Sequence, residues 1–215
     1  MKVASKICGV TGREAIDAAV EGAATHVGLV FFSRSPRNVT PVQAAALASL
    51  VPEHMEAVAL TVDPDDALVD AIGAIPDISM FQLHGSETPE RVAAIKQRTG
   101  RLAIKAIKVS EAADLASAAD YLDVADMLLF DAKTPVGMKN ALPGGNAVSF
   151  DWAILAGCDW PLPWMLSGGL NPDNVANAIR IGGATAVDVS SGVERTPGVK
   201  DPALIRAFLK AVKSV

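Results

Sequence analysis

Short apolar runs alternate along the chain with alanine-rich stretches in which apolar and polar positions recur at helical spacing. Each run is nearly uniform in Val, Ile, Leu and Phe, which is typical of parallel strands covered on both faces. The alternation therefore predicts repeated β/α units. The predicted strands are residues 2–8, 26–32, 56–62, 79–84, 102–108, 126–131, 163–167 and 185–190.

Capping residues followed by proline mark most of the predicted helix starts. The cap accepts a hydrogen bond from an unpaired amide, and proline at the first helical position gives up only a donor that has no partner there. Thr11, which has capping-box spacing to Glu14, and Ser110 and Ser149 are the predicted caps of the other helices. Each strand is thus followed by a helix. The cap and proline pairs are Thr40-Pro41, Asp63-Pro64, Thr88-Pro89, Asn171-Pro172 and Asp201-Pro202.

Eight strand and helix pairs favour a closed barrel over an open doubly wound sheet. The first strand ends in Cys8-Gly9-Val10-Thr11-Gly12, which lacks the Gly-x-Gly-x-x-Gly pattern of a dinucleotide-binding open sheet. The apolar residues are spread evenly, with no linker that would divide the chain. We therefore expect residues 1–215 to form a single (β/α)8 TIM barrel domain, with its chemistry at the carboxyl ends of the strands.

Composition and charge narrow the possible partners. A net charge of -5 and a pI near 5.2 argue against nucleic acid, because phosphate backbones favour clustered Lys and Arg. The mean hydropathy is +0.31, but no stretch approaches the roughly 20 apolar residues that span a membrane. No secretory signal pattern opens the chain, and only two cysteines are present, so we expect a cytoplasmic protein without disulfides. No obligate protein partner is predicted.

Two small-residue turns indicate a phosphate site. Ser167-Gly168-Gly169 follows the seventh predicted strand, and Ser190-Ser191-Gly192 follows the eighth. Glycine lets the backbone approach an anion closely, and barrels of this class commonly hold phosphate at these two loops. Either motif alone is typical of a simple tight turn, but the two together favour a phosphorylated small-molecule substrate. The fourth strand ends in Gln82-Leu83-His84-Gly85-Ser86-Glu87, which shows no second phosphate loop, so one phosphate is expected.

Charged residues at other strand ends are candidates for the remainder of the site. Arg37 follows the second strand, beside two phenylalanines and a rigid Ser35-Pro36 step, and its guanidinium could bind a carboxylate through paired hydrogen bonds. Asp131 ends the apolar run of the sixth strand, so it must be paired, exposed or functional. The same reasoning applies to Asp188, which we expect to contact a ligand or to accept a hydrogen bond at the barrel mouth. Three histidines without metal-ligand spacing predict no metal site.

Seven motifs in order along the whole chain resemble the phosphoribosylanthranilate isomerase family of tryptophan biosynthesis. Ser-Gly-Gly recurs in many phosphate-binding barrels, but the first and last of these motifs together are specific to this family. The motifs are Lys6-Ile7-Cys8-Gly9, Ser35-Pro36-Arg37, Gln82-Leu83-His84-Gly85, Phe130-Asp131, Ser167-Gly168-Gly169-Leu170, Asp188-Val189-Ser190-Ser191-Gly192-Val193-Glu194 and Pro197-Gly198-Val199-Lys200-Asp201.

The resemblance implies a cofactor-free Amadori rearrangement in which Asp131 is the general acid and Cys8 the general base. Without the resemblance, Cys8 would be interpreted as an inert buried thiol, as Cys158 is. For work near neutral pH, burial should raise the pKa of Asp131, and a cation such as Lys6 should favour the Cys8 thiolate if it is close enough. His84 is assigned no catalytic role.

One loop departs from the family pattern. Where the family commonly has Gly-Gly-Thr-Gly after the sixth strand, this chain has Gly144-Gly145-Asn146-Ala147. Alanine adopts positive φ less readily than glycine, so closure of a lid over residues 133–148 could differ. Two alternatives stay open. One is the related histidine-pathway isomerase, which acts on a substrate with two phosphates, and the other is a non-catalytic barrel that binds a phosphorylated ligand.

Overall fold

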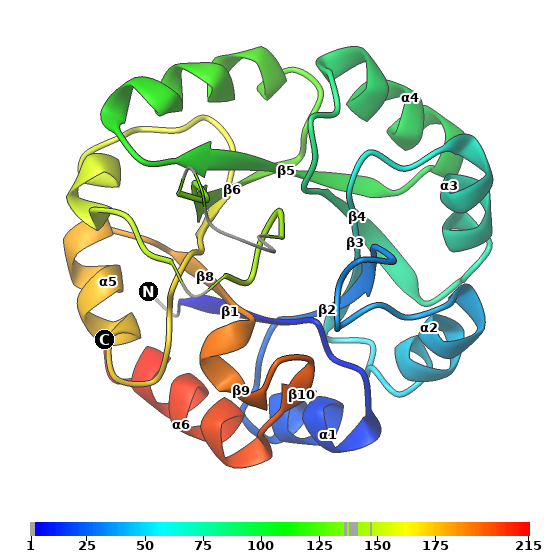
Figure 1. Cartoon of the computed structure of the whole chain (residues 1–215), viewed down its shortest axis with the longest axis horizontal. Coiled ribbons are helices and arrows are strands. Elements are labelled where there is room, and N and C mark those ends of the chain that lie inside the picture. The colour runs from blue at the N-terminus through cyan, green and yellow to red at the C-terminus, as the bar shows by residue number, and fades with distance from the viewer. Residues whose placement is uncertain (1–2, 136, 138–141, 147) are drawn as a thin grey trace.

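The computed structural model describes residues 3–135, 137, 142–146 and 148–215. Eight parallel strands close into a barrel in chain order, and β1 pairs with β8 to complete the ring (Figure 1). The predicted (β/α)8 barrel is therefore confirmed. The barrel strands are β1 (Ala4–Cys8), β2 (His26–Phe31), β3 (Glu56–Thr61), β4 (Ile78–Leu83), β5 (Leu102–Val109), β6 (Met127–Ala132), β7 (Trp164–Leu166) and β8 (Ala186–Val189).

Helices surround the barrel on its outer side (Figure 1). The prediction of an α-helix after every strand is wrong after β5 and β6, where the chain forms the 3₁₀ helices η1 (Ala112–Tyr121) and η2 (Trp152–Leu155). In η1, Asp and Ser side chains bind nearby backbone groups and so compete with α-helical hydrogen bonds. The α-helices are α1 (Arg13–Glu21), α2 (Pro41–Ala48), α3 (Asp66–Gly73), α4 (Pro89–Thr99), α5 (Val175–Gly182) and α6 (Pro202–Val212).

Three of the predicted caps are confirmed. Thr40 accepts from the amide of Gln43 in a complete capping box, Thr88 caps α4 and Asp201 caps α6. Four others, Thr11, Asp63, Ser110 and Ser149, are wrong, because the helices begin one or two residues later. The Asn171 side chain accepts from the amides of Asp173 and Asn174, as a cap does, although α5 itself begins at Val175. The observed capping positions are Gly12, Asp65, Glu111, Asp151 and Asn174.

Asp63 shows why one of these predictions failed. Its backbone is left-handed, with φ of 46°, and its carboxylate accepts from the amide of Ser86 at 2.7 Å. The side chain that was expected to cap a helix therefore ties the loop after β3 to the loop after β4. That bond helps to shape the mouth of the barrel.

After β8 the chain adds a short excursion before α6. The 3₁₀ helix η3 (Ser191–Val193) leads into a hairpin of β9 (Glu194–Thr196) and β10 (Val199–Lys200). This hairpin carries charged side chains that reach back to the barrel mouth.

Apolar residues fill the space between strands and helices, and a second apolar cluster fills the barrel interior. Its members are Val58, Met80, Ile104, Ala106, Leu129, Met165 and Ala186. Within the described part of the chain, no helix has the length and apolarity to cross a membrane.

His26, the first residue of β2, makes fold stability depend on pH. It is buried, and its Nδ1 lies 2.7 Å from Oγ1 of Thr25. Burial, and then the Lys6 cation, lower the pKa of His26 to about 4. A histidine in the unfolded chain has a pKa near 6.5, so between these values only the unfolded state takes up the proton. Stability must therefore fall as the pH drops through this window.

We expect His26 to lower the free energy of unfolding by about 2 kcal/mol between pH 7 and pH 5. Urea denaturation of the wild type and of His26→Gln at both pH values measures this contribution, which the variant should lack. His54→Gln, at an exposed position, is the matched control, and its free energy of unfolding should change between pH 7 and pH 5 as much as that of the wild type does. If His26→Gln and the wild type lose the same free energy of unfolding between pH 7 and pH 5, the His26 imidazole does not cause the pH dependence.

Candidate active site

Two adjoining pockets open at the carboxyl ends of the strands. The first has a volume of about 500 Å³ and is lined by Cys8, Arg37 and His84, among others. The second, of about 360 Å³, is lined by the loops after β6, β7 and β8. Asp131 and Asp188 line both pockets. The two pockets therefore form one continuous site with the aspartates at the junction.

All of the predicted site residues except Gly192 line one or both pockets. Cys8 and Arg37 line the first, Ser190 lines both, and the second is lined by Gly168, Gly169 and Ser191. Gly192 instead packs against the backbone of Leu170 and Asn171, so closely that a Cβ there would collide with the Leu170 carbonyl. This glycine is needed for the close approach of two loops, and its predicted role in substrate binding remains a prediction.

Cys8 ends β1 and is buried beside a charged pair. Lys6 Nζ binds Asp188 Oδ1 at 2.9 Å, and Ser167 Oγ donates to Asp188 Oδ2 at 3.3 Å. A Cβ at Gly28 would lie 2.9 Å from Cys8 Sγ and 3.1 Å from Lys6 Nζ, so Gly28 leaves room for both side chains. Lys6 is therefore close to the thiol.

Lys6 lowers the pKa of Cys8, as expected, but not enough to make the thiolate the favoured form near neutral pH. Burial raises the pKa of Cys8, and the Lys6 cation opposes this shift without cancelling it, because the Asp188 carboxylate also acts on the thiol. Although burial lowers it, the attraction of Asp188 holds the pKa of Lys6 above its ordinary value. The free molecule therefore holds Cys8 as a thiol beside a lysine and aspartate ion pair.

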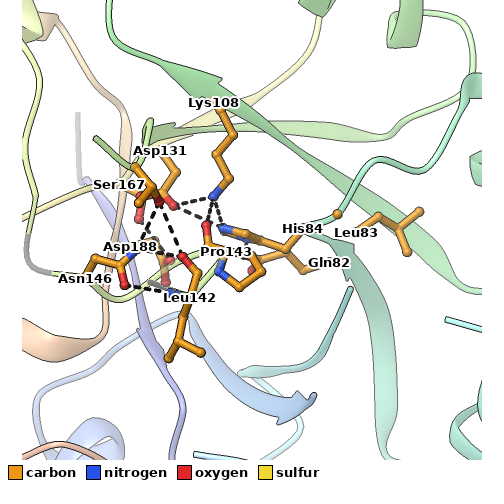
Figure 2. Close-up of polar contacts among 12 residues, drawn as sticks. Gln82, Leu83, His84, Lys108, Asp131, Leu142, Pro143, Asn146, Ser167 and Asp188 are labelled. Atoms are coloured by element: carbon orange, nitrogen blue, oxygen red, sulfur yellow. Dashed lines mark hydrogen bonds and ion pairs between the residues drawn. The ribbon is translucent and has the colours of Figure 1, made fainter. Parts of the chain in front are cut away.

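Asp131 on β6 lies in a cluster of polar side chains (Figure 2). Its Oδ2 is 3.0 Å from His84 Nε2 and 2.8 Å from Lys108 Nζ. The parallel register places Lys108 of β5 directly beside Asp131, which explains why they meet. Although burial raises the pKa of Asp131, the Lys108 cation and the His84 hydrogen bond outweigh burial and hold it well below its ordinary range. The expectation of a raised pKa is therefore wrong for the free molecule.

His84 connects Asp131 to a deeper amide. Its Nδ1 lies 2.8 Å from Nε2 of Gln82, and its Nε2 lies 2.5 Å from Lys108 Nζ. Burial and the Lys108 cation lower the pKa of His84, so the ring is neutral near pH 7. Lys108 was not among the site residues predicted from the sequence. The signal was present, because a lysine within an otherwise apolar strand needs a buried partner or an opening to solvent.

Arg37 lies in a second charged network, at the rim of the first pocket. Its Nε and Nη2 bind Glu194 at 2.7 and 2.8 Å, and Lys200 Nζ binds the same carboxylate at 2.7 Å. The guanidinium was expected to offer its paired donors to a ligand, but Glu194 occupies those donors. Burial lowers the pKa of Lys200 to about 8, although Glu194 opposes the shift. Lys200 also binds the carbonyl of Ser190, so the network supports the loop after β8.

The second pocket has the features of an anion site. Gly168 and Gly169 have φ angles of 91° and 64°, a region that favours glycine. Among the hydrogen bonds of the described residues, the amides of Gly168, Gly169 and Ser191 have no protein acceptor. Asn174 holds the loop in shape by donating to the carbonyl of Gly169 at 2.9 Å. These amides are available to bind an anion.

On the opposite side of the barrel, the backbone amides at the strand ends are already bound to a carboxylate. β3 and β4 lie half a turn of the ring away from β7 and β8 (Figure 1). There the Glu87 carboxylate accepts from the amides of Asp63 at 2.9 Å and Gly85 at 3.0 Å, and it binds Lys105 Nζ at 2.6 Å. An internal carboxylate thus occupies the donors that a second phosphate would need.

The loop from Leu142 to Asn146 covers the junction of the pockets. The Asn146 side chain binds both the amide and the carbonyl of Leu142, at 3.0 and 2.6 Å, and Lys108 Nζ binds the Pro143 carbonyl (Figure 2). Asn146, one of the departures from the family pattern, therefore braces this loop. Ala147 and parts of the predicted lid lie outside the described residues, and the lid remains a prediction.

Gly144 is required because the loop passes directly over the cluster. A Cβ at this position would lie 2.8 Å from His84 Nε2 and 3.3 Å from Asp131 Oδ2. We expect Gly144→Ala to displace the loop or the imidazole and to lower turnover about a hundredfold. Gly12→Ala is the control, since its Cβ would meet nothing within 4 Å. Steady-state assays of both variants measure the difference, and turnover of Gly144→Ala within threefold of the wild type would contradict this account of the loop.

Among the residues that the structure describes, no group of His, Cys, Asp and Glu side chains is arranged to hold a metal ion. The site instead combines a thiol, carboxylates and an imidazole with unpaired backbone amides. Cys8 and Asp131 face a shared cavity from β1 and β6, and the free amides lie beside Asp131.

Comparison with known proteins gives a consistent result. The sequence model of the N-(5'phosphoribosyl)anthranilate (PRA) isomerase family matches residues 5–211. A relative of that name from Paramagnetospirillum magneticum is 58% identical over 213 residues, covering 99% of this chain and 98% of the relative. A second, from Rhodospirillum centenum, is 56% identical over 210 residues, with 97% of each chain covered.

Solved structures of the same kind share the fold. The phosphoribosyl anthranilate isomerase of Thermotoga maritima superposes with a TM-score of 0.87 at 36% identity, covering 99% of this chain and all of the other. A phosphoribosyl anthranilate isomerase crystallised with reduced 1-(o-carboxyphenylamino)-1-deoxyribulose 5-phosphate gives a TM-score of 0.84 at 34% identity, with the same coverage.

Proposed function

The chain belongs to the N-(5′-phosphoribosyl)anthranilate isomerase family of tryptophan biosynthesis, and from that premise we propose that Asp131 and Cys8 perform its acid and base steps. The observation that carries the proposal is the shared cavity: both side chains line it, and it adjoins the pocket of free backbone amides. The substrate, N-(5-phosphoribosyl)anthranilate, has a ribose with a phosphate at one end and a carboxylate on the aromatic ring. Its anionic ends match the amide pocket and the Arg37 rim.

Ring opening is the acid step. Asp131 gives a proton to the ribose ring oxygen while the bond from C1′ to that oxygen breaks. The nitrogen lone pair of the anthranilate forms the C1′=N double bond of an iminium ion. General acid catalysis of this kind contributes roughly 10² to 10⁴ in rate.

Proton removal from C2′ is the base step. Cys8 takes that proton, and the electron pair becomes the C1′=C2′ double bond of an enolamine while the nitrogen is neutralised. The enolamine then gains a proton at C1′ and loses the proton of its 2′-hydroxyl, which gives the ketone, 1-(2-carboxyphenylamino)-1-deoxyribulose 5-phosphate. Each step moves protons and electron pairs within one molecule, so the reaction is balanced without a cofactor.

The protons in the free site are arranged the opposite way. Cys8 has a raised pKa and is a thiol, while Asp131 has a lowered pKa and is a carboxylate. The reacting arrangement contains the same number of protons, with one moved from Cys8 to Asp131. A bound phosphate next to Asp131 repels its negative charge and so raises its pKa towards the protonated form. Substrate binding therefore favours the form that reacts.

The carboxylate end of the substrate is assigned to the Arg37 rim. Glu194 takes Nε and Nη2 of Arg37, so the remaining nitrogen, Nη1, is the donor proposed for the ligand. Glu194 and Lys200 then act as supports that fix the guanidinium. The phosphate is assigned to the amides of Gly168, Gly169 and Ser191, with Ser190 and Asp188 lining the passage between the ends.

The histidine-pathway substrate, which has two phosphates, is a weaker candidate. The donors opposite the amide pocket are taken by the Glu87 carboxylate, which would also repel a second phosphate. Membership of an enzyme family also disfavours the alternative of a non-catalytic barrel. Cytoplasmic localisation and the formation of one domain by residues 1–215 remain predictions, the latter supported by the pairing of β1 with β8.

A fluorescence assay tests the proposed function. Purified protein should consume N-(5-phosphoribosyl)anthranilate with saturation kinetics, and it should leave the histidine-pathway substrate unchanged. Loss of the anthranilate compound no faster than in buffer would reject the proposal. Turnover of both substrates would reject the role given to Glu87 without affecting the acid and base assignment.

A further inference from the structure

Within the described part of the chain, Asp131 binds its neighbours through one of its two carboxylate oxygens. His84 Nε2 and Lys108 Nζ both contact Oδ2, at 3.0 and 2.8 Å. Oδ1 has no hydrogen-bond partner among the described residues, and Asp131 lines both pockets. The carboxyl group is therefore held from one side, and its other oxygen is the one left for a ligand.

Lys108 does more than pair with this carboxylate. Its Nζ also lies 2.5 Å from His84 Nε2 and binds the Pro143 carbonyl, which precedes the glycine that covers the cluster (Figure 2). One ammonium group thus joins β5, the residue after β4, β6 and the covering loop. Its side chain is 28% exposed, so the cluster is only partly screened by water.

We propose that Lys108 is a positioning residue for the isomerisation: it fixes Oδ2 of Asp131 and the Pro143 carbonyl together, so that Oδ1 faces the ribose ring oxygen beneath the 142–146 loop. This inference rests on the proposed function, because it concerns the same acid. Lys108 transfers no proton to the substrate itself. It acts by aligning the acid and by holding the loop that covers it.

Removal of the ammonium has two separable consequences. Asp131 loses its nearest cation, so its pKa rises, because an opposite charge within about 4–6 Å commonly lowers a carboxyl pKa by 1–3 units. The carboxyl and the loop also lose a common anchor, and misplacement of a reacting group by about 1 Å can cost about a hundredfold in rate. Among the residues that the structure describes, the charged and polar groups bonded to Lys108 are His84, Asp131 and the Pro143 carbonyl.

Lys108→Met tests the proposal, since methionine keeps an unbranched apolar chain without the charge. We expect kcat to fall at least tenfold, KM to rise, and the acid limb of the kcat/KM profile to move up by at least one pH unit. Lys108→Arg should restore the acid limb, because the charge is kept. A residue that only supports the fold would lower stability without moving the acid limb.

Lys96→Met is the matched control. Lys96 is 29% exposed and binds Asp126 Oδ2 at 2.8 Å, which closely matches the Lys108 pair, but it lies on α4 outside the pocket lining. This variant should keep the wild-type kcat and acid limb. Circular dichroism and thermal unfolding establish that each variant is folded before its kinetics are compared.

A folded Lys108→Met protein with an unchanged kcat or an unmoved acid limb would overturn the proposal. If this variant does not fold, Lys108→Gln serves as the second measurement, because it keeps a donor but no charge and carries the same expectation for the acid limb. The outcome is distinct from that of the proposed function. A wild type without turnover rejects the function, whereas an active wild type matched by Lys108→Met rejects only the role of Lys108.

Discussion

Replacement of Cys8 by serine should lower kcat about a thousandfold, since the hydroxyl is a far weaker base than the thiolate and general base catalysis contributes roughly 10² to 10⁴. The side chain is buried and the two residues are similar in shape, so the fold should be retained. Steady-state kinetics with N-(5-phosphoribosyl)anthranilate measure the effect. KM should change little, because the anionic ends of the substrate are bound elsewhere.

Cys158 is the natural control for this experiment. It is the other cysteine of the chain, it is partly buried after η2, and its Sγ lies 3.6 Å from the carbonyl of Ile154. Cys158→Ser should keep wild-type kinetics. If Cys8→Ser is folded and its kcat lies within tenfold of the wild type, another group must remove the proton from C2′.

Replacement of Asp131 by asparagine should also lower kcat about a thousandfold, because the amide has nearly the same shape but no proton to give to the ring oxygen. This fall in kcat should exceed the fall caused by removing a carboxylate that only pairs with a lysine. Asp126→Asn provides the comparison, since Asp126 also binds a lysine at 2.8 Å but lies away from the pockets. Wild-type turnover in that variant would show that the effect belongs to the site.

The pH profile distinguishes the acid role of Asp131 from a merely structural one. Since Cys8 has a raised and Asp131 a lowered pKa, the reacting arrangement is a constant fraction of the protein between the two values. The wild-type kcat/KM should therefore be flat from about pH 6 to pH 8. A steep rise or fall across this range would mean that one of the two groups does not hold its assigned proton.

Binding measurements show whether these losses lie in the chemistry. The reduced product analogue, 1-(o-carboxyphenylamino)-1-deoxyribulose 5-phosphate in reduced form, contains both anionic groups. Its Kd should stay within about tenfold of the wild type in Cys8→Ser and Asp131→Asn, because neither residue is assigned to the phosphate or the carboxylate. A much weaker affinity would assign these residues to binding instead.

The strands and the site residues at their ends could be predicted from the sequence because both depend on local pattern. A strand covered on both faces is apolar throughout, and a polar residue at its end, such as Asp131, stands out. Helix starts were less predictable, since Asp63 fits a capping pattern but its side chain binds the amide of Ser86 in another loop. Local spacing does not reveal such a competing partner.

The charge states of the site could not be predicted because they depend on neighbours across the barrel. Lys108 reaches Asp131 through the register of β5 with β6, and Asp188 reaches Lys6 through the register of β8 with β1. These pairs set the direction of each pKa shift. The partner of Arg37 is equally distant, since Glu194 lies far along the chain on the excursion after β8.

A crystal structure of the wild type with the reduced product analogue tests the convergence of Cys8 and Asp131 most directly. We predict the phosphate against the amides of Gly168, Gly169 and Ser191. The carbon and oxygen atoms derived from the ribose should lie between the Cys8 thiol and Oδ1 of Asp131. The account would be contradicted if the sugar chain did not contact both side chains, or if the phosphate were bound at the Glu87 side of the barrel.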